Sequence, residues 1–217
     1  MDSVLPPNMQ LDRYNMDLRT HFKQEFNSWF HRRIYQRFRP FQPRREYANI
    51  GCGPRIFEVA DNLDFPVLRT KKVKYEGMDL RYPLTIPTNS YQGIFCEHTL
   101  EHLSPKHSES FLKECNRVLK HGGKLRIIVP SLDYYRGLNY SAKNDSGFNS
   151  AVEAFFNLAQ NWGHKSIWDF EFIAKVLTSV GFTEITQSSF GKGHEVLKTF
   201  DFAERAKESL YVEALKP

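Results

Sequence analysis

The chain has little cysteine and no long apolar run, and both absences limit the classes of protein that fit it. The three cysteines, Cys52, Cys96 and Cys115, are an odd number without a C-x-x-C pair. We therefore expect reduced thiols, with neither a disulfide framework nor a zinc knuckle. No segment approaches the length of a membrane span, and the N-terminus lacks the basic and apolar regions of a signal peptide. These features predict a cytoplasmic protein.

Internal repeats and low-complexity segments are absent as well. The 217 residues are 41% hydrophobic and 25% charged, which fits one globular domain with a small appendage. The net charge of +5 is concentrated in residues 13–45, which hold nine Lys or Arg and only two acids. Such an arm suits phosphates, anionic lipid or an acidic partner, or it is a helix with a solvated cationic face.

Strand and helix patterns alternate along the rest of the chain. We expect strands at residues 46–50, 62–64, 72–78, 91–96, 125–129, 182–189 and 209–214. Helices are expected from Pro105 to a stop at Gly122-Gly123, at residues 151–159, and from Ser166 to Gly181. This order predicts a mostly parallel α/β sheet with helices on both faces.

Two glycines separated by one residue follow the first expected strand. Because they have no Cβ, Gly51 and Gly53 allow a sharp turn and the close approach of a ligand to the backbone. Doubly wound proteins hold adenosine-containing cofactors at such a turn, although a lone glycine pair often marks an ordinary one. Asp64 could accept both ribose hydroxyl protons. It lies 13 residues after Gly51, against about 20 in dinucleotide sites, so the first helix must be short.

Four segments in this order resemble the class I S-adenosylmethionine-dependent methyltransferases, and within them the compact type 11 branch often found beside sugar and polysaccharide biosynthesis. They are Asn49-Ile-Gly-Cys-Gly-Pro54, Asn62-Leu-Asp64, Asp79-Leu-Arg-Tyr-Pro-Leu-Thr-Ile-Pro87 with residues 89–95, and Glu97-His-Thr-Leu-Glu-His-Leu103 with residues 119–130. The resemblance implies a Rossmann-like, doubly wound, seven-stranded sheet with an antiparallel last strand. It also implies a methyltransferase domain at residues 47–217, with 131–165 as an acceptor-side insertion.

The same resemblance implies S-adenosylmethionine as the cofactor and assigns it a set of residues: Asn49, Gly51, Cys52, Gly53, Asp64, Phe65, Asp79, Leu80, Glu97 and His98. Asp64 would hold the ribose, while Asp79 and the Leu80 backbone would meet the adenine edge. Glu97 and His98 would lie beside the methionine portion. Two alternatives stay open: Asp79 could meet the ribose, or Asp64 could be a simple turn residue. Cys52 is expected to be a small filler.

His98-Thr-Leu-Glu-His102 also fits the H-x-x-E-H pattern that supplies zinc ligands in one class of metalloprotease. The string follows a buried strand, where the methyltransferase pattern accounts for it, and the sequence shows no convincing third ligand. We therefore expect no metal, and we assign Glu101 and His102 to orienting this loop.

Methyl transfer to a hydroxyl needs a base. The candidates are Glu97, His98, Asp133 and His164. Asp133 could be only a turn residue, and His164 only a cap for the next helix. Tyr134, Tyr135, Tyr140 and Trp162 are expected on the acceptor side, where aromatic rings suit many substrates or simple packing. We predict transfer to a small-molecule or glycan-type acceptor at a hydroxyl oxygen, with nitrogen next.

The arm at residues 1–46 contains a predicted helix at residues 15–38. Its apolar stripe consists of Leu18, Phe22, Phe26, Trp29, Phe30, Ile34 and Phe38. We favour a lid that buries this stripe over the cofactor cleft. A peripheral membrane anchor and a nucleic-acid arm are the alternatives, although no RNA-binding motif accompanies the charge.

Two rival functions stay open. One is a methyltransferase for nucleic acid or protein side chains, and the other is a non-catalytic protein that binds S-adenosylmethionine. We do not expect nucleic acid as the partner, and the oligomeric state is expected to be a monomer or a homodimer.

Overall fold

The computed structural model describes residues 18–66, 74–138, 140, 148 and 150–217. Within these residues one seven-stranded sheet has the order β3-β2-β1-β4-β5-β7-β6. Its strands are β1 (Tyr47–Ile50), β2 (Ala60–Asp64), β3 (Glu76–Gly77), β4 (Tyr91–Glu97), β5 (Leu119–Pro130), β6 (Thr183–Ser188) and β7 (Ser209–Leu215). Neighbours from β3 to β5 are parallel, whereas β7 is antiparallel to β5 and β6. The predicted sheet and its antiparallel last strand are confirmed.

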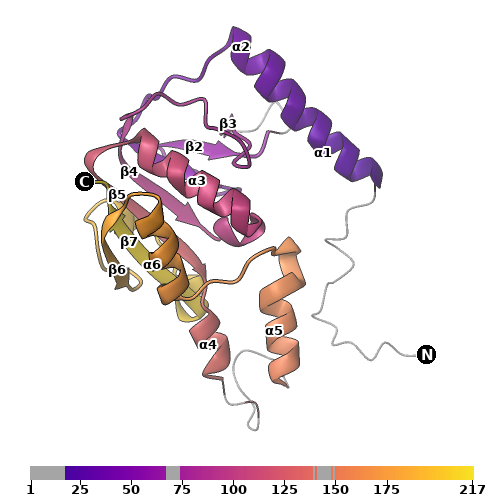
Figure 1. Ribbon diagram of the computed structural model, residues 1–217, viewed down its shortest axis with the longest axis vertical. Coiled ribbons are helices and arrows are strands. Elements are labelled where there is room, and N and C mark those ends of the chain that lie inside the picture. Colours follow the sequence, from indigo (N-terminus) through magenta and orange to yellow (C-terminus); the bar gives the residue numbers. More distant parts are fainter. Residues whose placement is uncertain (1–17, 67–73, 139, 141–147, 149) are drawn as a thin grey trace.

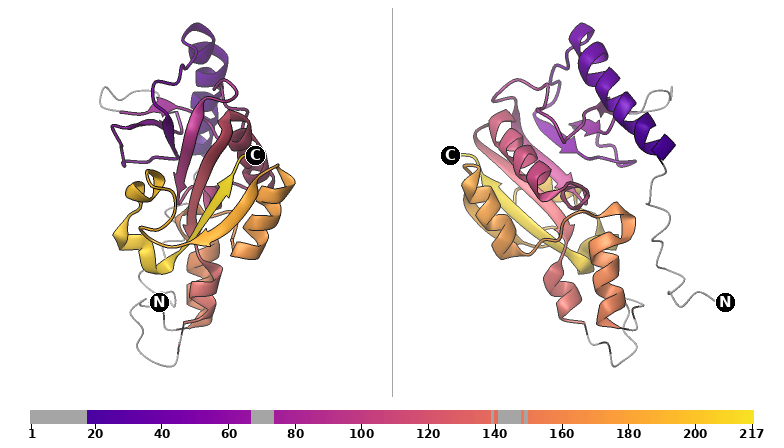
Figure 2. Two further views of the ribbon diagram at one scale, coloured as in Figure 1. Left: turned by 90° about the vertical axis from the view of Figure 1, so that its left-hand side faces the viewer. Right: turned by 45° about the vertical axis from the view of Figure 1, so that its right-hand side comes forward.

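Different kinds of element cover the two faces of this sheet. Helices α3 (Pro105–Val118) and α6 (Phe170–Ser179) lie side by side on one face (Figure 1). Opposite α6 lie the 3-10 turns η5 (Leu197–Phe200) and η6 (Ala203–Glu208), as the left view of Figure 2 shows. Helix α4 (Leu132–Arg136) follows β5, and α5 (Ala151–Gln160) packs against α4. The main core lies beneath α3 and α6, with side chains such as Ile94, Leu112 and Ile127.

Helix α3 begins as predicted and ends earlier. Ser104 caps its first turn by accepting a hydrogen bond from the backbone of His107. The helix ends at Val118, and β5 begins at once with Leu119 paired to Tyr91. Gly122, which was expected to cap the helix, instead has a φ of +75° within the irregular first part of β5. The predicted helix end is therefore wrong, because pairing with β4 extends the strand toward its N-terminus.

Helix α6 also begins later than the sequence suggested. Asp169 is its N-cap and accepts a hydrogen bond of 2.8 Å from the backbone N–H of Phe172. Ser166, which was expected to start the helix, donates instead to the carbonyl oxygens of Leu100 and Leu103. A β-bridge between Ser131 and Trp168 keeps this segment extended, so the helix can start only after it.

The connection between β1 and β2 is short, as the spacing from Gly51 to Asp64 predicted. In the described chain, residues 51–59 form turns and no helix. The backbone N–H groups of Gly51 and Cys52 both donate to Leu63 O, at 2.8 and 3.1 Å. The glycine turn is therefore folded back onto the end of β2.

The N-terminal helix presents the face opposite to the one expected. It runs through α1 (Leu18–Phe30), a π-helical segment η2 (His31–Tyr35) and α2 (Gln36–Phe38). Leu18, Phe22 and Phe38 of the predicted stripe are 88%, 73% and 77% exposed. The buried residues are polar: Asn27, Ser28, His31 and Gln36.

Polar groups at the β3 edge account for this orientation. Gln36 Nε2 donates to Gly77 O at 3.3 Å, and Ser28 Oγ donates to the Asp79 carboxylate. A half-buried carbonyl and a buried carboxylate need such donors, so the polar face is the one that packs on the domain. The expectation that the Phe stripe is buried is therefore wrong.

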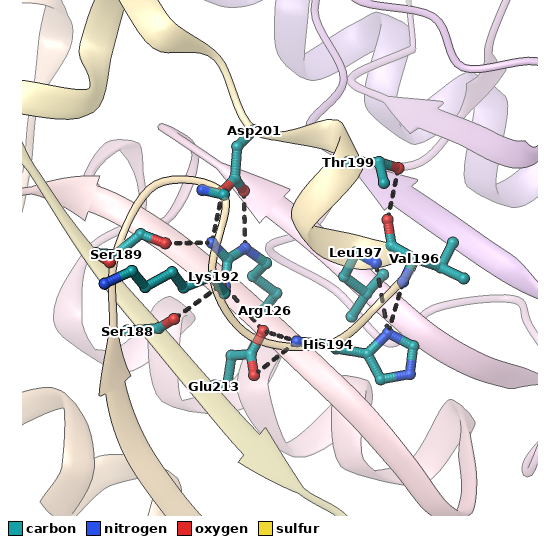
Figure 3. Close-up of polar contacts among 11 residues, drawn as sticks. Arg126, Ser188, Ser189, Lys192, His194, Val196, Leu197, Thr199, Asp201 and Glu213 are labelled. Carbon is teal, nitrogen blue, oxygen red and sulfur yellow. Dashed lines mark hydrogen bonds and ion pairs between the residues drawn. The ribbon is translucent and has the colours of Figure 1, made fainter.

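A fully buried arginine holds a long loop against the sheet (Figure 3). Arg126 of β5 pairs with Asp201 at 2.6 Å and with Glu213 of β7 at 2.8 Å, and it donates to Ser189 O at 3.1 Å. The loop of residues 189–201 leads into η6, which borders the smaller of two cavities described below. Arg126 therefore positions part of the candidate site.

Candidate active site

A cavity of about 680 Å³ lies between α1 and the carboxyl ends of the central strands. Its sheet side is formed by the glycine turn and by the residues that follow β2, β3 and β4: Gly51, Gly53, Asp64, Phe65, Asp79, Leu80, His98 and Thr99. Thr20, His21, Gln24 and Glu25 of α1 line the opposite side. This cavity holds seven of the ten predicted cofactor residues, His98 among them.

A second cavity of about 160 Å³ lies on the other side of the glycine turn. It shares Gly51, Gly53 and His98 with the first. Its remaining walls include Asn49, Cys52, Arg55, Phe57, Glu97 and Arg205. The predicted cofactor residues thus divide between two cavities that meet at the glycine turn. Arg55 and Arg205 were missed from the sequence, although Arg55 directly follows the glycine motif.

Asp64 is joined to the glycine turn by hydrogen bonds. The backbone N–H of Gly53 donates to Asp64 Oδ2, and the backbone N–H of Phe65 donates to Oδ1. A Cβ on Gly51 would lie 2.0 Å from Thr99 Oγ1, whereas a Cβ on Gly53 would meet nothing within 4 Å. Both glycines have positive φ, of +72° and +51°. Gly51 is therefore required by packing, and Gly53 borders open space.

The Asp79 carboxylate is occupied by partners within the chain. It accepts hydrogen bonds from Ser28, from the Arg81 backbone at 3.0 Å and from the Arg81 guanidinium at 2.7 Å. Burial alone would raise the pKa of Asp79, but the hydrogen bonds from Arg81 and Ser28 outweigh it and lower the pKa. Arg81 also pairs with Glu25. Asp79 therefore lines the large cavity while it anchors α1.

Glu97 and His98 follow β4 and face different partners. Buried Glu97 pairs with Arg55, whose guanidinium lies 3.4 Å above the Phe202 ring. Burial raises the pKa of Glu97 in spite of the nearby charges of Arg55 and His98. His98 has a positive φ of 45°, and its Nε2 lies 2.9 Å from Ser209 Oγ. Its Nδ1 lies 3.2 Å from Glu101 Oε1.

His164 lies next to His102, although the two are far apart in the sequence. Their ring centroids are 5.0 Å apart, and ligand atoms of Glu101, His102 and His164 all lie within 4.8 Å of one another. Burial lowers the pKa of His102, which opposes the effect of the Glu101 charge. His102, Gly163 and Lys165 line the large cavity. A distant loop thus brings His164 to Glu101 and His102 of the H-x-x-E-H string, in a group that does not include His98.

Asp133 is not brought to either cavity. It lies on α4 with its side chain 63% exposed, and it pairs with Arg136 at 3.6 Å. Tyr135 is buried in a separate cluster with α5 and donates to Glu208 at 3.1 Å. Trp162 alone of the predicted acceptor-side aromatics lines the large cavity.

Comparison with known proteins agrees with this fold. Residues 58–127 match a family model described as a methyltransferase domain, of type 11. The chain is similar to the crystal structure of an S-adenosylmethionine-dependent methyltransferase from Archaeoglobus fulgidus, with 17% identity and a TM-score of 0.53 over 92% of this chain and all of that one. It is likewise similar to such a protein from Thermotoga maritima, with 17% identity and a TM-score of 0.54 over 91% of this chain and 97% of that one.

A third structure has the same fold over nearly the whole chain. It is described as the complex between the Haloferax volcanii Trm112 methyltransferase activator and a protein assigned as a methyltransferase, at 12% identity and a TM-score of 0.50, covering 98% of this chain and all of that one. The domain match confirms the prediction of a methyltransferase, and the chain has the Rossmann-like fold of the S-adenosylmethionine-dependent class.

Proposed function

We propose that the chain transfers a methyl group from S-adenosylmethionine to a hydroxyl oxygen of a small-molecule or glycan-type acceptor. The observation that carries this proposal is the pair of cavities that meet at Gly51 and Gly53. One cavity has a volume of about 680 Å³, whereas the other has about 160 Å³ and is bordered by the charged groups of Arg55, Glu97 and Arg205. A sulfonium cofactor that spans the turn would have its nucleoside and its amino acid portion in these two different environments.

The large cavity suits the nucleoside. Asp64 accepts one described hydrogen bond on each oxygen, so each retains a lone pair for a ribose hydroxyl. Phe65 lies beside it, and the Leu80 backbone would meet the adenine edge. Asp79 would support this edge while its carboxylate stays bonded to Ser28 and Arg81.

The small cavity suits the amino acid portion. Arg55 and Arg205 supply positive charge for a carboxylate, and Glu97 supplies negative charge for an ammonium group. Asn49 donates to Arg55 O at 2.8 Å and thereby supports the turn. Cys52 is buried and small, in keeping with the role of a filler.

Alignment is the main task of the protein in methyl transfer, because the cofactor supplies the reactive sulfonium when bound. Of the four candidate bases, His98 lines both cavities. Glu97 is paired with Arg55, and Asp133 is exposed on α4. We therefore assign the acceptor proton to His98 Nε2, which would exchange its contact with Ser209 Oγ for the acceptor hydroxyl while Glu101 holds Nδ1.

The proposal is tested by calorimetry and by transfer of labelled methyl groups to a panel of sugars, small alcohols and amines. S-adenosylmethionine should bind, and product should appear with at least one hydroxyl acceptor. His98→Ala should lower kcat by about 10²–10⁴-fold, the usual range for a base, while cofactor binding is kept. Absence of cofactor binding would overturn the proposal.

The same assay separates the two rivals. A methyltransferase for nucleic acid or protein side chains would methylate RNA or polypeptide and leave the small acceptors unlabelled. Its binding to RNA would weaken as the salt concentration rises. A non-catalytic binder would be stabilised by the cofactor and label nothing. We place the chain with the sugar- and polysaccharide-associated branch, and in a reducing, cytoplasmic setting that suits its three buried free thiols.

We also propose that the N-terminal helix touches an anionic lipid surface. Its outward stripe of Leu18, Phe22, Phe26, Trp29 and Phe38 is exposed. The exposed cations Arg19, Lys23, Arg33 and Arg37 accompany it. Glu25 is the one acid of this helix among the described residues, and it pairs inward with Arg81. Aromatic residues beside unbalanced cations are what anionic headgroups attract.

A lipid surface fits this stripe better than a second copy of the chain. A symmetric dimer across the stripe would bring the same cations of both copies together with no acid between them. None of the described helices is long and apolar enough to span a membrane. The contact would therefore be peripheral. It would bring the large cavity, which α1 lines, close to a lipid-linked acceptor.

Vesicle sedimentation tests this contact. Phosphatidylcholine vesicles with a third of phosphatidylglycerol should bind the full chain at low salt, and pure phosphatidylcholine should bind it weakly. Phe22→Ser with Trp29→Ser should abolish binding, and Phe156→Ser, on the exposed part of α5, is the matched control. No sedimentation with anionic vesicles, or a dimer that Phe22→Ser with Trp29→Ser dissociates, would refute it.

A further inference from the structure

We propose that Glu101, His102 and His164 bind a divalent transition-metal ion, such as Zn²⁺, at the rim of the large cavity. One ligand atom from each lies within 4.8 Å of the others. Ligands at about 2.0–2.2 Å from a zinc ion lie roughly 3–4 Å from one another. Small side-chain rotations would therefore bring the three ligand atoms to these distances. Two imidazoles and one carboxylate form a ligand set typical of catalytic zinc and of non-haem iron.

Both imidazoles have a hydrogen-bond partner in the backbone. His164 Nδ1 lies 2.8 Å from Leu158 O. Because a carbonyl only accepts, this nitrogen must carry the proton, which leaves the lone pair on Nε2. The His102 ring has a similar backbone partner at Gly163. A hydrogen bond from the outer nitrogen to a carbonyl is the usual support of a metal-bound histidine.

Glu101 gives the strongest support for a cation at this position. Its side chain is 2% exposed, and neither carboxylate oxygen accepts a hydrogen bond of good geometry within the described chain. His98 Nδ1 lies close, at 3.2 Å from Oε1, but it does not satisfy both oxygens. A buried carboxylate with only this one close side-chain donor is costly, and a cation between Glu101 and the two imidazoles would reduce this cost.

Local hydrogen bonding alone gives a weaker account of the cluster. It explains why Glu101 faces His98, and it gives no reason for two imidazoles to be held edge to face, 5.0 Å apart, beside the same carboxylate. A shared ion accounts for all three groups. It also accounts for the approach of the loop around His164, whose next residues Lys165 and Ser166 donate to Glu101 O.

The site would bear on the proposed methyl transfer, and this part of the inference rests on that function. His102 and Gly163 line the cavity, so the free coordination positions would face the acceptor. A metal ion there would orient an acceptor hydroxyl or carboxylate and lower the pKa of the hydroxyl. Acceptors with two adjacent oxygens, such as vicinal diols, would fit best.

Metal binding is measured on the tag-free full chain after dialysis against a chelator. Zn²⁺ should bind with one equivalent by calorimetry, and Co²⁺ should give visible absorption bands of a site with nitrogen and oxygen ligands. His164→Ala and Glu101→Gln should each weaken Zn²⁺ binding by at least about 100-fold, since each removes a ligand. His121→Ala, an exposed histidine elsewhere, should leave it unchanged.

The outcomes separate this inference from the proposed function. S-adenosylmethionine binding should persist in His164→Ala, which also shows that the variant is folded. No stoichiometric binding, or equal Zn²⁺ affinity in wild type, His164→Ala and Glu101→Gln, would overturn the metal site and leave methyl transfer standing. If the wild-type protein does not bind S-adenosylmethionine, the proposed function is overturned and the metal site is unaffected.

Discussion

The backbone N–H of Gly53 donates a hydrogen bond to the Asp64 carboxylate. The glycine turn and the end of β2 are therefore one unit, although 11 residues separate the two partners. The short connection between β1 and β2 makes this contact geometrically natural, because Gly51 and Cys52 also donate to Leu63 O. Any ligand held by Asp64 is consequently held against the glycine backbone.

Replacement of Asp64 by Ala should weaken S-adenosylmethionine binding by about 10- to 100-fold, the range expected when hydrogen bonds to a charged group are lost. The turn should also loosen, because the Gly53 N–H loses its acceptor. Isothermal titration calorimetry measures the affinity, and Asp133→Ala is the control for a carboxylate outside both cavities. Equal affinity of Asp64→Ala and wild type would rule out the ribose role.

The two glycines should respond differently to Ala. At Gly51 the new Cβ would lie 2.0 Å from Thr99 Oγ1, on a φ of +72°. We expect a loss of at least about 2 kcal/mol from strain and overpacking. At Gly53 the Cβ has free space, so only the roughly 1–2 kcal/mol of left-handed strain applies.

Urea denaturation measures these losses, and cofactor titration completes the comparison. Gly53→Ala should remain folded at 25 °C and bind S-adenosylmethionine more weakly, because its methyl group enters the space between the cavities. Should Gly53→Ala bind as tightly as wild type, the cofactor does not pass over this turn.

Protonation of the Asp79 carboxylate at low pH should detach α1 from the rest of the domain. Its hydrogen bonds from Arg81 and Ser28 hold the pKa of Asp79 below the ordinary 3.8. A carboxyl whose pKa is lowered on folding contributes stability that is complete above the unfolded pKa and is lost as the pH falls through the folded pKa. The difference in unfolding free energy between wild type and Asp79→Asn should therefore be constant above about pH 5 and shrink below about pH 4.

Limited proteolysis within residues 18–38 can follow the helix itself over the same pH range. Cleavage of wild type should rise below about pH 4, and Asp79→Asn should be cleaved already at neutral pH. Asp133→Asn, on an exposed ion pair, should match wild type throughout. A pH-independent difference between Asp79→Asn and wild type would contradict this linkage.

Arg126→Met should destabilise the chain by about 3–5 kcal/mol, because two buried carboxylates lose their partner. Asp201 and Glu213 would remain in the core without a cation. Lys124→Met is the matched control on the same strand, since its pair with Glu184 is largely exposed and should be worth at most about 1 kcal/mol. Urea unfolding measures both, and a similar loss in the two variants would contradict a special role for Arg126.

The sheet could be predicted because its signals are local. Alternating apolar runs, the glycine motif and the capped start of α3 each depend on a few neighbouring residues, and they located all seven strands along the chain. Helix ends were less accurate, because the end of α3 depends on pairing between Leu119 and Tyr91. The short path from Gly51 to Asp64 was also readable from spacing alone.

The misjudged features depend on partners distant in the sequence. The face that α1 buries is set by Gly77 and Asp79, whereas the stripe rule assumes that the apolar face is the one covered. Arg126 was not singled out from the sequence, because the two carboxylates that pair with it lie 75 and 87 residues away. His164 reaches His102 through the fold, so the string from His98 to His102 could not reveal it.

The polar attachment of α1 has a thermodynamic consequence. Ser28, Glu25 and Gln36 bind groups that water can also solvate, so we expect that much of the surface exposed by detaching the helix would be polar. The heat-capacity change of this opening should therefore be small, since that quantity follows apolar exposure. Added salt would weaken the pair between Glu25 and Arg81. The helix at the mouth of the cavity would accordingly respond to ionic strength more than to temperature.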